Sequence, residues 1–266
     1  MADFTLGRYM PLDSVIHKMD PRAKIIAMLI VLVAIFFPAG WIGYAIIFAV
    51  VAVVILLAGL SWQFIWKSMK PMLYMLLFLL IINALVVKTG TPLFTIAGWS
   101  LYSDAVTQTL YIAVRLLLMI MITTCLTATT KPLDMTLGIE DLLAPLVKIH
   151  VPAHEIAMLI SIALRFIPDL IDETERIMKA QESRGVDMKE GKLSERIMAI
   201  LSLIVPLFVS AFQRAEDLAN AMEARGYMPG EPRTRYKVLK MHGRDVILLI
   251  GSSAILALMV YLSYFA

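Results

Sequence analysis

The chain has 266 residues, of which 60% are hydrophobic and 17% are charged, with a mean hydropathy of +0.80. A soluble domain is roughly half apolar and a quarter charged, so this composition predicts an integral membrane protein. The formal net charge of +3 is too small to indicate nucleic-acid binding. With one cysteine, Cys125, the chain can build neither a disulfide framework nor a thiolate metal site.

Five apolar runs are candidate membrane spans, because a helix of about 20 apolar residues crosses the hydrocarbon core of a bilayer. The first run, 25–37, is short and is broken by Pro38-Ala39-Gly40. The other four are 41–60, 71–87, 105–129 and 246–264. The N-terminus lacks the basic and apolar regions of a cleaved signal, so the first span is expected to be retained. Residues 91–102 alternate around Gly98 and predict a small β-hairpin.

Lysine and arginine predict the orientation, since they concentrate on the cytoplasmic side of short loops. Basic residues precede the first span and lie between the second and third: Lys18, Arg22, Lys24, Lys67 and Lys70. The opposite side has only Lys88. We therefore expect a multi-pass protein of the cell membrane with a cytoplasmic N-terminus and, after five spans, a C-terminus outside.

A charged region, 131–244, holds 16 of the 24 basic residues and 16 of the 21 acidic residues. One helix or two short pieces are predicted over 132–149, with a break at Pro145. Two long helices with 3.6-residue periodicity follow, one from Pro152 to about residue 184 and one over about 193–225. The expected fold is an all-α membrane protein, with long cytoplasmic helices inserted before the last span. Its expected domains are N-terminal membrane helices (1–130), a cytoplasmic coupling-helix region (131–244) and a final transmembrane helix (245–266).

Two apolar stretches within this region, 156–171 and 197–212, permit an alternative with seven spans. The second stretch has 16 uncharged residues, about 24 Å of helix, which is marginal for crossing. If both crossed, residues 172–196 would carry six basic residues to the outside, against the positive-inside pattern. The favoured prediction keeps both helices cytoplasmic, beneath or against the membrane.

Each long helix ends in a similar tetrad, and the two tetrads, which are 41 positions apart, are Glu182-Ser183-Arg184-Gly185 and Glu223-Ala224-Arg225-Gly226. Ordinary helix termination explains part of the pattern, because glycine favours the left-handed conformation after a helix and arginine complements the helix dipole. The repeat at corresponding ends of adjacent helices supports a second interpretation. It indicates a matched pair of contact points for another protein.

Two polar residues inside the predicted spans are further candidates for a functional role. Arg115 is costly to bury and is a functional candidate for that reason, unless it snorkels or pairs with a backbone carbonyl. Asn83 is expected to form a hydrogen bond between helices. The five predicted spans contain no Asp, Glu or His, which argues against an ion-coupled carrier or an intramembrane protease. The chain also lacks a phosphate-binding loop motif, so it is not expected to hydrolyse ATP or to bind a cofactor.

The order of these features resembles the transmembrane (T) component of energy-coupling factor vitamin transporters, over nearly the whole chain. Besides the paired tetrads, the segments Leu164-Arg165-Phe166-Ile167-Pro168, Leu12-Asp13-Ser14 and Asp20-Pro21-Arg22-Ala23-Lys24 are similar to that family. The resemblance implies two cytoplasmic ATPase subunits and a small membrane S subunit that binds the vitamin. It places the motif arginines at Arg184 and Arg225, where they would dock into grooves of the ATPases. Ser183 stands where alanine is usual.

The leading hypothesis is therefore a non-catalytic scaffold that transmits motion from ATPases to an S subunit through the two arginine-ended helices. The alternative is a stand-alone secondary carrier or channel, with Arg115 and Asn83 lining its path. A membrane enzyme is the third hypothesis, and it would need a nucleophile or a metal site that the sequence does not present.

Overall fold

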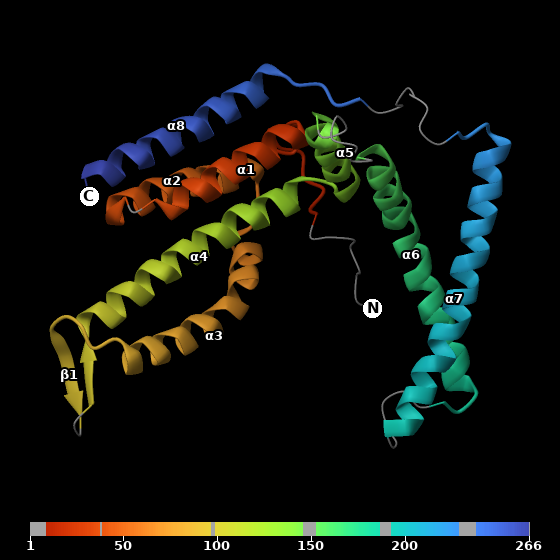
Figure 1. Cartoon of the computed structure of the whole chain (residues 1–266), viewed down its shortest axis with the longest axis horizontal. Coiled ribbons are helices and arrows are strands. Elements are labelled where there is room, and N and C mark those ends of the chain that lie inside the picture. Colours follow the sequence, from red (N-terminus) through yellow and green to blue (C-terminus); the bar gives the residue numbers. More distant parts are fainter. Residues whose placement is uncertain are drawn as a thin grey trace. The chain divides into compact units, whose positions relative to one another are not determined.

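The computed structural model describes residues 9–37, 39–96, 99–145, 153–186, 193–228 and 238–265. They form an all-α integral membrane protein with one short β-hairpin (Figure 1). The chain divides into two compact units, which we call the membrane unit (1–150 and 239–266) and the two-helix unit (151–238). The helix at 132–143, which follows the fourth predicted span, packs in the membrane unit.

The membrane unit contains six described helices and one hairpin. The helices are α1 (Pro21–Phe36), α2 (Gly40–Ala58), α3 (Trp62–Val86), α4 (Ser103–Thr129), α5 (Pro132–Leu143) and α8 (Gly243–Phe265). Strands β1 (Pro92–Ile96) and β2 (Trp99–Tyr102) pair antiparallel, which confirms the predicted hairpin. Gly98, at its expected apex, lies outside the described residues.

Helix boundaries follow local capping chemistry. At α1, the Asp20 side chain accepts a hydrogen bond from the Arg22 backbone N–H, and Pro21 occupies the first turn. Helix α3 begins nine residues before the predicted start at Pro71, because Ser61 caps it by accepting from the Gln63 N–H. Pro71 therefore lies inside α3, and this helix is bent in Figure 1. A proline removes one intrahelical hydrogen bond and commonly bends a helix without ending it.

The core of the membrane unit lies where α1, α2, α4 and α8 meet. Helix α1 packs along α8 and α4, and α2 packs along α4 and α8. Fully buried members of this core include Ala34, Ile35, Ile47, Leu118 and Met259. Small residues such as Ala34 let neighbouring helices approach closely, and close approach drives helix association in membranes.

The two-helix unit consists of α6 (Ala153–Ser183) and α7 (Leu193–Ala224). Their ends confirm the predicted terminations before Gly185 and Gly226. Five described helices are long and apolar enough to cross a membrane, namely α2, α3, α4, α7 and α8. This total matches the predicted five, but α7 replaces the first predicted span, since α1 has only 16 residues. The assignment of α1 as a span and α7 as a cytoplasmic helix stays a prediction.

Candidate functional site: the paired arginine tips

The tip of α6 is built by a glycine in the left-handed conformation. Gly185 has φ +82°, and its N–H donates to the Glu182 carbonyl at 3.0 Å. The next N–H, of Val186, donates to the Gln181 carbonyl at 3.0 Å. These two bonds form a Schellman motif, which closes the last turn and satisfies carbonyls that the helix leaves open. The backbone therefore holds Arg184 at a defined position, on the last turn before the chain reverses.

The tip of α7 repeats the same geometry. Gly226 has φ +73°, and its N–H donates to the Glu223 carbonyl at 2.9 Å. The Tyr227 N–H donates to the Met222 carbonyl at 3.0 Å. Every donor and acceptor in this motif is 41 residues after its counterpart in α6. The two arginines thus occupy equivalent backbone positions, and ordinary glycine capping is the reason for that equivalence.

All eight residues of the tetrads are exposed. No salt bridge or side-chain hydrogen bond joins the guanidinium of Arg184 or Arg225 to another described residue. An arginine that is exposed on a capped helix end, with no partner among the described residues, can present its guanidinium to a carboxylate of another protein.

Helices α6 and α7 form an antiparallel pair. The Arg214 guanidinium of α7 contacts Glu173 at 3.3 Å and Asp169 at 3.6 Å in α6. Nearer the tip of α6, the Gln181 side chain donates to the Ser202 carbonyl at 3.3 Å. The partner number in α7 falls as the number in α6 rises, so the two chains run in opposite directions, as Figure 1 also shows.

This arrangement places the two arginine tips at opposite ends of the pair. Glu173 and Arg214, which contact each other, are each 11 residues before their own tip arginine. At about 1.5 Å per residue, the tips lie roughly 33 Å apart along the helix axes. The contact joins two positions that the 41-residue register makes equivalent, as expected for two helices related by a local two-fold axis.

Arg214, the polar link between the helices, was not among the site residues predicted from the sequence. A signal was available, because the 41-residue register aligns Glu173 with Arg214 and so pairs opposite charges at one position. In an antiparallel pair related by a local two-fold axis, residues at equivalent positions near that axis face each other. Neither Glu173 nor Arg214, considered separately, predicts this contact.

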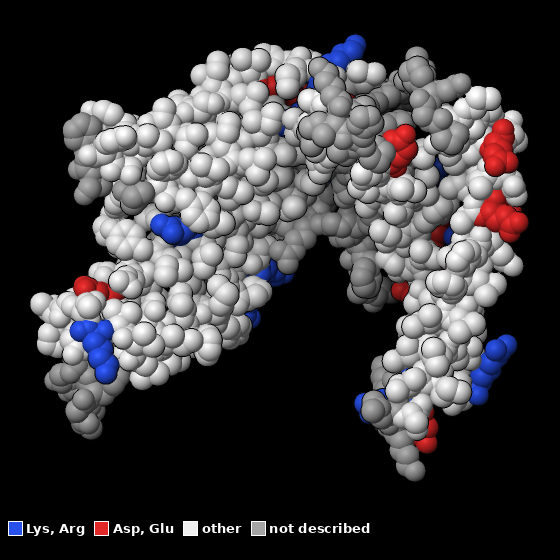
Figure 2. All heavy atoms as spheres, viewed as in Figure 1, with Lys and Arg blue, Asp and Glu red and all other residues white. Residues whose placement is uncertain are grey.

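The apolar part of α7 is exposed in the two-helix unit. Its exposed large side chains include Met198, Leu201, Val205, Phe208 and Phe212, and Phe208 packs edge-on against Phe212 at 4.7 Å between centroids. An exposed apolar surface of this kind marks contact with lipid or with another protein. The membrane unit has a similarly apolar surface, with few charged side chains in the view of Figure 2.

Arg115 and Asn83, the two candidates within the spans, both have partners. Nε and Nη2 of Arg115 in α4 lie 3.3 and 3.1 Å from the Tyr44 hydroxyl of α2, to which they donate. The Arg115 guanidinium also lies 5.5 Å from the centroid of the Phe36 ring. The partner is thus a hydroxyl and a ring rather than the backbone carbonyl considered from sequence. Asn83 of α3 donates to the Thr109 hydroxyl of α4 at 3.0 Å, which is the expected bond between helices.

Comparison with known proteins agrees with these features. Residues 13–236 match the family model described as cobalt transport protein, CbiQ. The chain is 43% identical to the energy-coupling factor transporter transmembrane protein EcfT of Macrococcus caseolyticus, over 97% of each chain. It is 42% identical to the protein of the same name from Listeria innocua and 41% identical to that from Bacillus subtilis, over 98% of this chain and 99% of each relative. The chain therefore belongs to the family of transmembrane (T) components of energy-coupling factor transporters.

Proposed function

We propose that the chain is the non-catalytic scaffold of an ATP-driven importer of a vitamin or other micronutrient. In this proposal it links two cytoplasmic ATPase subunits to a membrane S subunit, and it transmits ATP-driven motion through α6 and α7. The observation that carries the proposal is the pair of exposed arginines, Arg184 and Arg225, on identical Schellman caps at opposite ends of an antiparallel helix pair.

The geometry of the tips suits a pair of similar partners. Arginine presents a planar fork that binds a carboxylate through two hydrogen bonds, and such contacts resist small displacements. Two ATPase subunits related by a two-fold axis offer two equivalent grooves, which a helix pair with its own local two-fold can fill at both ends. Glu182, Ser183 and Gly185, with Glu223, Ala224 and Gly226, surround the arginines at these contacts.

The apolar surface of the same helices supports the second half of the proposal. Phe208 and Phe212 of α7 are each 62% exposed, which is costly in water and favourable against another apolar surface. We place the S subunit on the apolar faces of α6 and α7. Movement at the tips then reaches the S subunit through the length of each helix.

The proposal is tested first by coexpressing the tagged chain with its ATPase and S subunits. The expected result is copurification of all subunits in detergent and ATP-dependent uptake by vesicles that contain the complex. The purified chain alone should transport nothing. Uptake by the chain alone would overturn the scaffold role and favour the stand-alone carrier or channel. The described contacts of Arg115 and Asn83 give that alternative no separate support.

Cysteine labelling tests the proposed topology. In a Cys125→Ser background, we expect Ser183→Cys and Ala224→Cys to react with an impermeant maleimide only in inside-out vesicles. Both positions are exposed and lie at the two tips. Because the tips are at opposite ends of the pair, a helix α7 that crossed the bilayer would expose one cysteine on each side. Labelling from opposite sides would contradict the cytoplasmic placement.

A further inference from the structure

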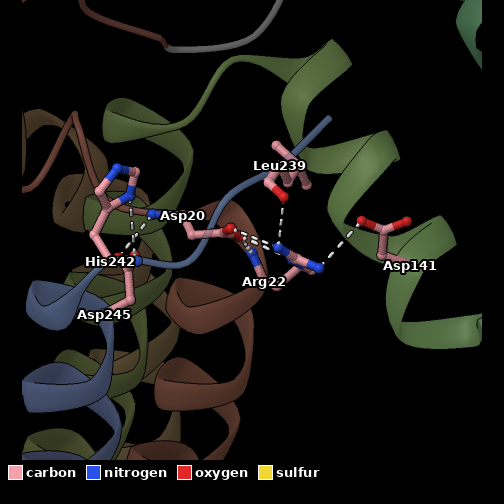
Figure 3. Close-up of polar contacts among 6 residues, drawn as sticks. All are labelled: Asp20, Arg22, Asp141, Leu239, His242 and Asp245. Atoms are coloured by element: carbon pink, nitrogen blue, oxygen red, sulfur yellow. Dashed lines mark hydrogen bonds and ion pairs between the residues drawn. The ribbon is translucent and has the colours of Figure 1, made fainter. Parts of the chain in front are cut away.

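Three segments of the membrane unit meet at one side chain, Arg22, at the start of α1. Figure 3 shows its guanidinium lying between Asp20, the Leu239 carbonyl and Asp141. Asp141 belongs to α5, and Leu239 lies just before α8. The side chain of Arg22 is 21% exposed and that of Asp20 is 1% exposed, so this junction is largely enclosed by protein.

The contacts of Arg22 use the whole guanidinium. Nε and Nη2 donate to the two carboxylate oxygens of Asp20 at 3.2 and 2.9 Å. Nη2 also donates to the Leu239 carbonyl at 3.1 Å, and Nη1 lies 3.4 Å from Asp141 Oδ2. Lysine cannot reproduce this set, because its ammonium is a single point of charge without the planar fork.

Asp20 extends the junction to α8. Its backbone N–H donates to Asp245 Oδ1 at 2.9 Å, and Asp245 Oδ2 accepts from the His242 N–H at 2.7 Å. Burial raises the pKa of Asp20, but the hydrogen bonds from the Arg22 side chain and backbone outweigh burial and hold that pKa below its usual value. The Asp20–Arg22 ion pair is therefore intact at neutral pH.

Helix α5 is seated closely against the same corner. A Cβ placed on Gly138 would lie 3.1 Å from the Pro21 Cβ and 3.4 Å from the Arg22 backbone nitrogen. Such spacing is tight even for packed side chains, so glycine at 138 lets α5 approach the first turn of α1. The Arg22–Asp141 ion pair thus spans a close helix contact.

The partners of Arg22 lie on either side of the two-helix unit in the chain. The two-helix unit spans 151–238, so Asp141 lies in the last described helix before it and Leu239 is the first residue after it. Arg22 therefore contacts both the last described helix before the two-helix unit and the first residue after it, and it is itself part of α1 and is linked to α8 through Asp20. A force on either connection reaches α1 and α8 through short polar contacts.

We infer that Arg22 is a positioning residue for energy coupling, which anchors both connections of the two-helix unit to the first and last helices of the membrane unit. This inference rests on the proposed function. Without the anchor, the ATPases would still bind the tips and hydrolyse ATP, but less of the motion of α6 and α7 would reach the membrane unit.

The test compares ATP hydrolysis and substrate uptake by the same reconstituted complex. For Arg22→Gln, we expect a subunit composition equal to wild type, hydrolysis within about 2-fold of wild type and uptake per ATP lowered about 10-fold, a typical size for coupling between distant sites. Asp141→Asn, which neutralises the acidic partner of Arg22 on α5 and leaves Asp20 and Leu239 in place, should lower uptake per ATP by a smaller factor. Arg22→Lys should fall between wild type and Arg22→Gln.

The matched control is Lys18→Gln, which breaks the exposed Lys18–Asp13 pair nearby and should leave uptake per ATP unchanged. An unchanged ratio in Arg22→Gln and Asp141→Asn would overturn the inference, and so would loss of assembly in parallel with uptake in both variants. If the Arg22→Gln variant does not insert into the membrane, uptake per ATP of the Asp141→Asn variant decides the test. A wild-type chain that does not assemble with ATPases defeats the proposed function itself, and this is seen before any variant is compared.

Discussion

Replacement of both tip arginines, Arg184→Ala with Arg225→Ala, is expected to release the ATPase subunits from the chain and to abolish ATP-driven uptake. Each guanidinium is exposed and has no partner among the described residues, so the intact chain should fold without it. A charge-assisted hydrogen bond contributes about 1.5–3 kcal/mol, so each loss should weaken docking by roughly 10- to 100-fold. The double variant should therefore copurify with little or no ATPase.

The equivalence of the two tips also predicts how the single variants compare. Because the two Schellman caps have the same bonds at a spacing of 41 residues, the single variants Arg184→Ala and Arg225→Ala should weaken docking to a similar extent. Lysine at both positions keeps the charge and loses the fork, and should give an intermediate amount of bound ATPase. The measurement is the ratio of ATPase to scaffold after affinity purification.

The matched control removes the same charge from α6 at a position away from both tips. Arg176 is exposed and lies eight residues before Arg184, and Arg176→Ala should leave ATPase binding at the wild-type level, in contrast to Arg184→Ala. If the control and the tip variant lose ATPase equally, the effect is one of net charge. Wild-type binding and uptake by the tip variant would refute the role of these arginines.

Local sequence signals predicted much of the fold. The apolar runs located α4 and α8 to within a few residues, and glycine after an arginine located the ends of α6 and α7. These features depend on neighbouring residues, through periodicity and capping. The start of α3 was predicted too late because Pro71 was treated as a boundary, whereas the cap at Ser61 determines the beginning of the helix.

The polar contacts around Arg22 and Asp20 could not be predicted from local sequence signals. Arg22 and Leu239 are 217 positions apart, and Asp20 and Asp245 are 225 apart, so no local pattern relates them. Their pairing depends on α1 and α8 packing side by side in the membrane unit. The segment Asp20-Pro21-Arg22 was noted from its resemblance to the family, but its partners became visible only in the fold.

The second large effect is expected at this junction, from Asp245→Ala. The Asp245 side chain is 1% exposed and accepts from two backbone N–H groups, of Asp20 at 2.9 Å and His242 at 2.7 Å. Alanine leaves both donors without this acceptor, at about 1.5–3 kcal/mol for each bond to a charged group. We expect a total loss of about 3–6 kcal/mol in the free energy of unfolding, or roughly 10 °C in Tm of the purified chain in detergent.

Two further variants separate the lost acceptors from general effects of mutation. Asp245→Asn keeps one carbonyl acceptor in a side chain of the same shape and should lose about half as much stability, on the order of 2 kcal/mol. Asp13→Ala removes an acid whose side chain is 82% exposed and should leave the Tm at the wild-type value. A Tm of Asp245→Ala equal to that of Asp13→Ala would show that the contact between α1 and α8 does not depend on this carboxylate. The expected order, Asp245→Ala below Asp245→Asn below Asp13→Ala, follows from the number of backbone donors that each variant leaves without an acceptor.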